Sequence, residues 1–377
     1  MATSNIGKGA IISYIAIFLN IAISFLYTPW MLRQIGVSDY GLYSLIISFI
    51  SYFIMDFGLS SAIARFIARY RAEGNEKKIA NMLGITTKVY LSIDTIIFLI
   101  LTVCYFFITD IFKGLTPEEI SKLKVLYIIA GSFSVLSFAF KPMDGAMTAF
   151  EYFVPSKLLD MIHKVGVVVL VVVALLLHGS VYSLVFINGV VAFLTSIAKF
   201  IYWSRKSKVR INLLYYDKQE TKELFSYSGW TFIQGLGQRM RLSLVPSVLG
   251  IFSNSEEIAI FALGMTIEAM TWTLSSALNG LFLPTVSRMS YKDDNKAIHE
   301  LMVRVGRLQL FIVTLILLGF YCFGRQFIHL WVGDNFANVF WVVVFLTFTN
   351  VISNTLQIAT EMVFIKNLLK ILRKKLI

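Results

Sequence analysis

Two arginines within a long apolar stretch are the residues of this sequence whose chemistry is easiest to interpret. Arg239 and Arg241 lie near the middle of the apolar run from Phe225 to Phe252. A charged side chain is costly at the centre of a lipid bilayer, so such a position indicates function unless a neighbouring group neutralises the charge. Because a guanidinium group binds phosphate through a bidentate fork, the two arginines predict a site for a phosphate-bearing ligand.

Polar residues around these arginines recur with helical spacing. Thr231, Gln234, Gln238 and Arg241 are three or four residues apart, which places them on one face of a helix. Arg239 lies on a different face of the same helix. A stripe of this kind can line a water-filled cavity, and we therefore predict that Arg241, Arg239, Gln238 and Gln234 bind substrate.

A structural ion pair is the alternative role for both arginines. Glu268 and Asp94, which lie in two other apolar runs, are the candidate partners. The two carboxylates are therefore predicted to belong either to an ion pair or to a site that couples transport to an ion.

Asp56 is a further candidate for ion coupling. It precedes Gly58 and the basic residues Arg65 and Arg69. A carboxylate in a helical bundle of low dielectric can bind H+ or Na+. The competing interpretation is an ion pair at a helix end between Asp56 and a basic residue such as Arg65, and the sequence does not decide between the two.

The elements that must position these residues are membrane-spanning helices. Hydrophobic residues make up 57% of the 377 residues and charged residues only 15%, so most of the chain is suited to lipid. A helix needs about 20 apolar residues to cross the hydrocarbon core. About ten runs approach or exceed that length: 10–31, 40–63, 85–108, 123–140, 157–177, 181–203, 225–252, 258–283, 308–323 and 339–360.

The net charge of +12 predicts an orientation in the membrane and no nucleic-acid partner. Lysine and arginine crowd alternate loops, including the groups Arg65 to Lys78, Arg205 to Arg210 and Arg288 to Lys296. The remaining loops hold few cations. This is the positive-inside pattern, and it predicts a multi-pass protein of a cytoplasmic membrane with a cytoplasmic N-terminus.

Metal, cofactor and enzyme chemistry find no support in the sequence. Cys104 and Cys322 both lie in apolar runs, and the four histidines lack ligand spacing. The outer loop near residues 109–122 is short and contains no Arg or His for a catalytic site. No nucleotide-binding motif of the Walker type is present. We expect no cofactor, no metal, no catalytic residue and no enzymatic activity.

The chain matches itself at a nearly constant offset. Pro29 aligns with Pro246, Arg69 with Arg288, and Cys104 with Cys322, as expected for an internal repeat. The repeat predicts two pseudo-symmetric six-helix lobes related by an axis along the membrane normal, with the second lobe truncated.

The repeat also predicts the domain boundaries. We expect an N-terminal lobe at 1–203, a cytoplasmic linker at 204–224 and an incomplete C-terminal lobe at 225–377 that ends in a basic tail. From residue 365 onward the tail has the spacing of an amphipathic helix that can lie in a membrane surface. The repeat favours the alternative, a truncated further helix.

Two segments carry a resemblance to a known family. The first is Asn20 to Tyr43, with the run Pro-Trp-Met-Leu-Arg-Gln-Ile-Gly-Val-Ser-Asp-Tyr-Gly-Leu-Tyr. The second is Met55 to Arg71, which begins with Asp-Phe-Gly-Leu-Ser-Ser-Ala from Asp56. They resemble the polysaccharide transporter family of the multidrug/oligosaccharidyl-lipid/polysaccharide exporter superfamily, which includes flippases for O-antigen and capsule repeat units.

The resemblance implies a function for the predicted site. It implies transport of undecaprenyl-pyrophosphate-linked oligosaccharides to the outer leaflet by alternating access, for O-antigen (lipopolysaccharide), capsule or another surface polysaccharide. Asn20 joins the predicted substrate-binding residues. H+ or Na+, membrane lipid and polysaccharide assembly proteins are the partners it implies.

Two other functions stay open at this point. A cation-coupled multidrug efflux antiporter of the same superfamily would favour acidic residues in its cavity, whereas Arg239 and Arg241 favour an anionic substrate. An inactive truncated transporter is the other alternative, because the second lobe is incomplete.

Overall fold

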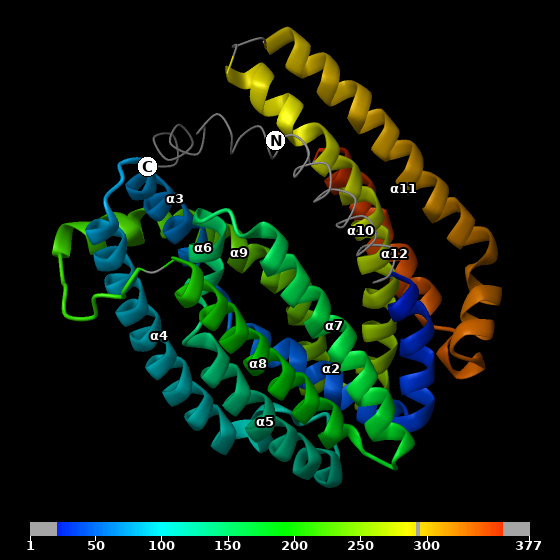
Figure 1. Cartoon of the computed structure of the whole chain (residues 1–377). Helices are drawn as coiled ribbons and strands as arrows, with labels where there is room; N and C mark the ends of the chain where they lie inside the picture. The colour runs from blue at the N-terminus through cyan, green and yellow to red at the C-terminus, as the bar shows by residue number, and fades with distance from the viewer. Residues whose placement is uncertain (1–20, 208, 292–294, 357–377) are drawn as a thin grey trace. The chain divides into compact units, whose positions relative to one another are not determined.

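The computed structural model describes residues 21–207, 209–291 and 295–356, and the regular secondary structure in those ranges is helical (Figure 1). Within them, the side chains at 230, 231, 234, 238, 241, 242, 275–291, 295–298, 354 and 355 lie outside the described part of the chain. The expected all-α fold is confirmed for the described residues.

Helices follow one another along the whole described chain. The first helical residues are 21–35. The labelled elements that follow are α2 (Val37–Ser51), α3 (Leu59–Ala72), α4 (Glu76–Ile111), α5 (Pro117–Phe138), α6 (Pro142–Ala149), α7 (Phe153–Leu176), α8 (Val181–Ser207), α9 (Lys218–Phe252), α10 (Ser255–Tyr291), α11 (Asn295–Trp331), the 3-10 turn η1 (Asp334–Phe336) and α12 (Val339–Thr355).

Local sequence signals explain where several helices begin. Thr116 and Glu119 form a capping box before α5, and Pro117 occupies its first turn. Asn75 accepts a backbone N–H at the start of α4, and Asp217 does the same at the start of α9. The first N–H groups of a helix lack intrahelical acceptors, so these side chains fix the helix starts.

The second predicted span is a correction to the sequence analysis. A single helix is expected from Tyr40 to Ile63, whereas the structure has two helices, α2 and α3, separated by residues 52–58. Phe57 has φ 52° and Gly58 has φ 73°, both in the left-handed region. A left-handed conformation cannot continue an α-helix, so the chain changes direction beside Asp56.

Among the described residues, six helical stretches are long and apolar enough to cross a membrane, and three shorter apolar helices accompany them. The six are Glu76–Ile111, Pro117–Ala149, Phe153–Leu176, Val181–Ser207, Ser255–Leu274 and His299–Trp331, and the shorter ones are Val37–Ser51, Ser243–Phe252 and Val339–Ser353. Only 11% of the apolar window in α7 is buried by the protein. Such exposed apolar surface is suited to lipid, and the chain is a multi-pass membrane protein.

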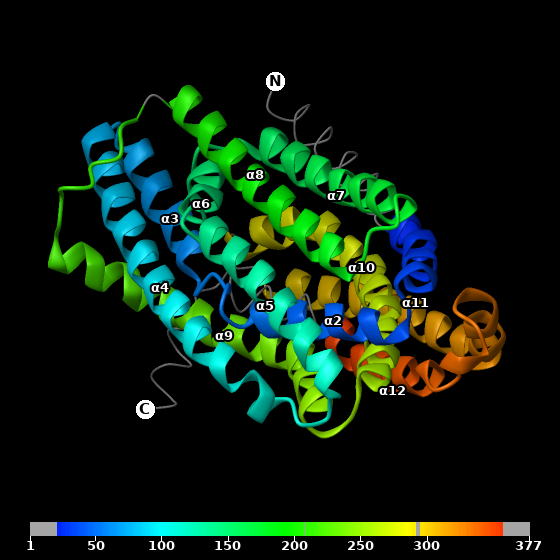
Figure 2. The same ribbon diagram turned by 90° about the horizontal axis from the view of Figure 1, so that it is seen from below.

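Contacts divide the chain into two packing units. Of the described residues, unit 1 contains 30–207 and 209–259, and unit 2 contains 21–29, 260–291 and 295–356. Within unit 1, α3 packs on α6, α5 and α7 on α8, and α2 on α9, as Figures 1 and 2 both show for α5, α7 and α8. The core of unit 1 includes Leu42, Ile63 and Met82, each fully buried.

Unit 2 is held together by α10, α11 and α12. The largest contact within it joins α11 and α12. Gly264 of α10 packs directly on α12, since a Cβ at that position would lie 2.4 Å from Cγ1 of Val342. The repeat-based lobes with a linker at 204–224 are a different division of the chain, and they stay a prediction.

Candidate functional site

Asp56 lies at the break between α2 and α3, and three donors surround its carboxylate. Oδ1 accepts hydrogen bonds from the Tyr90 hydroxyl at 2.5 Å and the Ser60 hydroxyl at 2.7 Å. Oδ2 accepts the Ser60 backbone N–H at 3.0 Å. Tyr90 lies on α4 and is fully buried. The carboxylate therefore joins α4 to the start of α3, and its negative charge is well solvated by protein donors.

Arg65 contacts an aromatic ring rather than Asp56. Its guanidinium carbon lies 4.7 Å from the centroid of the Tyr227 ring, which joins α3 to α9 by a cation–π contact. Among the described residues, Asp56 forms no ion pair. The role of Asp56 in ion coupling stays a prediction.

Asp94 is a buried carboxylate on α4. Its side chain is 8% exposed, and in the described part of the chain Oδ1 has no hydrogen-bond partner. A buried ionised carboxylate with an unpaired oxygen is costly, so this position favours binding of a proton or a cation. Asp94 forms no ion pair with Arg239 within the described residues.

Glu268 belongs to a buried polar contact within unit 2. The Asn350 side-chain amide of α12 donates to Oε1 of Glu268 on α10 at 2.7 Å. Both side chains are nearly inaccessible to solvent, and the buried Thr347 lies one turn before Asn350 on α12. An ion pair of Glu268 with Arg239 or Arg241 would join the two units, and it stays a prediction.

The α9 stripe is described only in part. Arg239 is half-buried, and it forms no ion pair with the described residues. The side chains of Arg241, Gln238 and Gln234 lie outside the described part of the chain, as does Asn20. Their predicted roles in substrate binding therefore stay predictions.

The position of α9 in unit 1 is fixed by a buried contact one turn beyond the arginines. The hydroxyl groups of Ser243 on α9 and Ser51 on α2 share a hydrogen bond of 2.8 Å. Both serines are buried, and a hydrogen bond between two helices in an apolar layer fixes their register.

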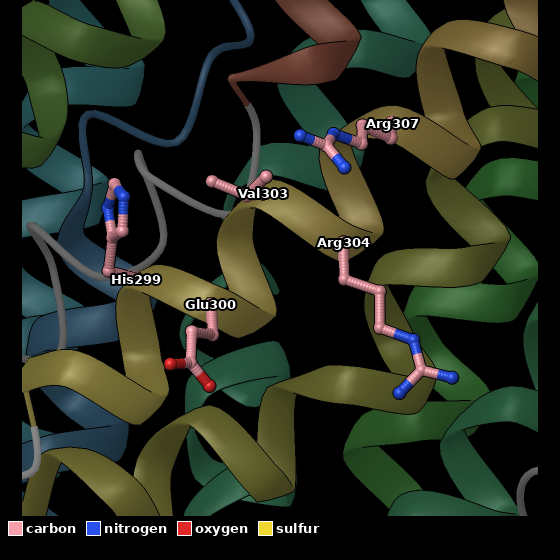
Figure 3. Close-up of a pocket in the computed structure, with 5 residues that line it drawn as sticks. All are labelled: His299, Glu300, Val303, Arg304 and Arg307. Atoms are coloured by element: carbon pink, nitrogen blue, oxygen red, sulfur yellow. The ribbon is translucent and has the colours of Figure 1, made fainter.

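A largely open cavity of about 350 Å³ lies along one side of α11 (Figure 3). The described residues that line it are His299, Glu300, Val303, Arg304 and Arg307, all from α11. Arg304 and Arg307 are exposed and form no ion pair with the described residues. Figure 3 shows their guanidinium groups extending in different directions from the helix. Each guanidinium group can donate to an oxyanion at this surface.

A family model described as polysaccharide biosynthesis protein matches residues 6–290. The chain belongs to this family. The match covers unit 1 and most of α10, and it includes Asp56, Asp94, Arg239 and Glu268. The resemblance to polysaccharide transporters is confirmed, together with the all-α polytopic fold. Comparison with curated proteins gives no match.

Solved structures show that this polysaccharide biosynthesis protein has the fold of membrane transporters. The lipid II flippase MurJ in an inward closed conformation has a TM-score of 0.72 at 13% identity, over 96% of this chain and 76% of the flippase. An inward-facing multidrug resistance MATE family transporter of the MOP superfamily has a TM-score of 0.66 at 16% identity, over 94% and 86%. A eukaryotic MATE transporter has a TM-score of 0.63 at 16% identity, over 95% and 81%.

Arg304 and Arg307 were not among the residues predicted from the sequence. They lie just before the apolar run that begins at Leu308 and beyond the residues matched to the polysaccharide biosynthesis family. The signal that could have found them is their spacing of three residues, which places both on one side of a helix. The structure shows that α11 continues through them without a break from Asn295.

Proposed function

We propose that this protein is a transporter that moves a phosphate-bearing, lipid-linked oligosaccharide across the bacterial cytoplasmic membrane by alternating access. The observation that carries the proposal is the cavity on α11 with Arg304 and Arg307, which form no ion pair with a described residue. Both arginines are exposed at the end of α11 that precedes its apolar run, and a guanidinium group binds phosphate through a bidentate fork.

The substrate class in the proposal is an undecaprenyl-pyrophosphate-linked repeat unit of O-antigen, capsule or another surface polysaccharide. Membership of the polysaccharide biosynthesis family supports the sugar. The similarity in fold to a lipid II flippase supports a lipid-linked substrate. Arg241, Arg239, Gln238, Gln234 and Asn20 are further proposed contacts for the pyrophosphate and the sugar.

Coupling to H+ or Na+ is the second part of the proposal. Asp94 is its best-supported residue, because Oδ1 is buried without a partner in the described part of the chain. Asp56 and Glu268 already accept hydrogen bonds from protein donors, so binding an ion there would need those contacts to rearrange.

A cation-coupled efflux antiporter is the second candidate function. The MATE folds and the buried carboxylates Asp94 and Glu268 favour it. An efflux protein for cationic drugs would need acidic residues facing its substrate, whereas the cavity on α11 contains more cations than anions. Replacing the arginines should weaken transport of an anionic lipid and leave transport of a cationic dye unchanged or faster.

The proposal can be tested in proteoliposomes with a fluorescent polyprenyl-diphosphate disaccharide. Its movement between leaflets is followed by adding a membrane-impermeant quencher. We expect Arg304→Ala with Arg307→Ala to slow transport on the order of tenfold or more, since hydrogen bonds to charged groups contribute about 1.5–3 kcal/mol each. The matched control is Lys77→Ala with Lys157→Ala, two exposed cations in the first turns of α4 and α7. Equal rates for the control and the Arg304/Arg307 variant in folded protein would exclude the arginines from transport.

A further inference from the structure

The loop of residues 209–217, which connects α8 to α9, is bound tightly to the first part of α4. The backbone N–H of Asn212 donates to the Ala80 carbonyl at 3.1 Å. Its side-chain amide donates to Oδ1 of Asn81 at 2.8 Å. We call residues 209–217 the docked loop.

Gly84 of α4 allows this close approach. A Cβ at Gly84 would lie 1.8 Å from the carbonyl oxygen of Asn212, which is far inside van der Waals contact. Any other residue at this position would therefore displace the docked loop from α4.

Lys88 fixes the second half of the docked loop. Its ammonium group donates to the Tyr215 carbonyl at 2.5 Å and lies 5.7 Å from the centroid of the Tyr216 ring. The backbone of the docked loop is thus attached to α4 at two places about two turns apart. These two attachments fix the direction of the loop's side chains.

The side chains presented by this fixed backbone are apolar and exposed. Leu214 is 96% exposed, Tyr216 66% and Leu213 52%. Leaving such side chains in water is unfavourable, because each forgoes the gain from burial of its apolar surface.

Cations outnumber acidic residues near the docked loop in sequence. The exposed cations are Arg205, Lys206, Arg210, Lys218 and Lys222, and the acidic residues are Asp217, Glu220 and Glu223. Asp217, the acidic residue of the docked loop, has its carboxylate engaged by the Glu220 backbone N–H at the start of α9. The exposed surface of the loop therefore combines apolar tips with a positive charge.

The position of the docked loop along α4 indicates its depth in the membrane. The loop contacts Ala80 to Lys88, and the continuous apolar part of α4 follows Lys88. At about 1.5 Å per residue, the 36 residues of α4 exceed the hydrocarbon thickness of about 30 Å, so the first turns of α4 lie outside it. A loop bound to these first turns is expected to lie near the membrane surface.

We propose that the docked loop is a lipid anchor, in which Leu214 and Tyr216 insert into the headgroup region of an anionic leaflet while the neighbouring lysines and arginines contact lipid phosphates. Tyr is enriched at the boundary between membrane and water, and Lys or Arg near that boundary is attracted to anionic lipids. The anchor requires only that α4 spans the membrane, and it is independent of the transported substrate.

Fluorescence on single-cysteine proteins tests the anchor. In full-length protein with Cys104→Ala and Cys322→Ala, Leu214→Cys is labelled with an environment-sensitive fluorophore and reconstituted into vesicles of phosphatidylcholine with phosphatidylglycerol. We expect blue-shifted emission, quenching by doxyl-labelled lipids and protection from iodide. Lys77→Cys, exposed at the start of α4, is the aqueous reference, and Phe106→Cys, 71% exposed in the apolar part of α4, is the lipid reference.

Two further variants separate the anchor from a chance location near lipid. Gly84→Ala should move the Leu214 label toward the aqueous reference, and Arg210→Gln with Lys218→Gln should remove the dependence on phosphatidylglycerol. The anchor is refuted if the label matches Lys77→Cys in unmodified Gly84 protein, an outcome that would point to a protein partner. It is also refuted if neither Gly84→Ala nor the charge variant changes the signal.

Discussion

Replacing Tyr90 by Phe removes the hydrogen bonds of one hydroxyl group from the break between α2 and α3 and little else. The Tyr90 hydroxyl donates to Oδ1 of Asp56 at 2.5 Å from a fully buried side chain, and it shares a longer hydrogen bond of 3.3 Å with the Ser60 hydroxyl. Phe keeps the ring and its contact with Phe138, whose ring centroid is 5.3 Å away. The packing of α4 is therefore retained, and the loss reports mainly on the shorter hydrogen bond to Asp56.

The size of the loss depends on the charge of Asp56. Hydrogen bonds to ionised groups contribute about 1.5–3 kcal/mol, and neutral ones about 0.5–1.5 kcal/mol. Tyr127 provides the neutral comparison, because its hydroxyl donates to the Leu101 carbonyl at 2.8 Å in a buried position. Hydrogen bonds between membrane helices average about 0.6 kcal/mol, and we take this value as the smallest cost expected for Tyr127→Phe. We expect Tyr90→Phe to cost about 1 kcal/mol more than Tyr127→Phe.

Thermal unfolding in nanodiscs measures this difference. A thiol-reactive dye reports exposure of Cys104 on α4, in protein carrying Cys322→Ala because Cys322 is exposed in the folded state. Asp56→Asn completes a double-mutant cycle, since it keeps the shape of the acceptor and removes its charge. In that background, Tyr90→Phe should cost no more than Tyr127→Phe.

The reasoning fails if Tyr90→Phe and Tyr127→Phe lower the unfolding temperature equally with Asp56 intact. It also fails if the effects of Tyr90→Phe and Asp56→Asn are simply additive, because residues that share a charged hydrogen bond must show a coupling energy. Either result would mean that the Tyr90 hydroxyl gains nothing from the charge of Asp56.

Two further predictions concern stability. Gly264→Ala should destabilise unit 2 by about 1–3 kcal/mol, because the added methyl group overpacks against Val342. Gly237 has open space around it, so Gly237→Ala should be neutral or stabilise the protein by up to about 1 kcal/mol. Thermal unfolding temperatures of the two variants test this difference. Burial is the largest cause that raises the pKa of Glu220, and the charge of Asp217 adds to it. The folded protein therefore retains the Glu220 proton to a higher pH than the unfolded chain does, so the free energy of unfolding should fall as pH rises above about 4.3. In Glu220→Gln, the unfolding temperature should depend less on pH over that range.

Helix positions were the part of the fold that the sequence predicted well. The runs 85–108, 157–177 and 181–203 correspond to α4, α7 and α8, whose ends differ by a few residues in most cases. The physical reason is direct, because a helix exposed to lipid must be apolar along the length that crosses the hydrocarbon. The polar start of α4 was missed, since it extends three turns beyond the apolar run and is stabilised by contacts with the docked loop.

The break at residues 52–58 could not be predicted from local sequence. Apolar residues continue through Tyr52 to Met55, and Gly58 was the only local sign of a turn. The left-handed conformation of Phe57 is compensated by the contacts of Asp56, which include Tyr90, distant in sequence on α4. Such tertiary compensation leaves no periodic signal in the chain.

The candidate site was predicted by residue type better than by partner. An ion pair was one of two roles left open for Asp56, and among the described residues the structure provides the neutral donors Ser60 and Tyr90. Glu268 accepts a hydrogen bond from the neutral Asn350, and its ion pair with Arg239 or Arg241 stays a prediction. Sequence spacing identifies which charges enter the membrane, but the choice between a charged and a neutral partner depends on which side chains the fold brings within hydrogen-bond distance.

Hydrogen bonding separates three buried or half-buried carboxylates of the described chain by their expected roles. Asp56 and Glu268 accept hydrogen bonds from buried donors, so both take part in holding helices together. Oδ1 of Asp94 has no partner in the described part of the chain. A buried carboxylate oxygen without a donor destabilises the protein unless a ligand compensates it during the working cycle. Asp94 therefore suits an exchangeable cation or proton better than Asp56 or Glu268, whose hydrogen bonds would have to be broken first.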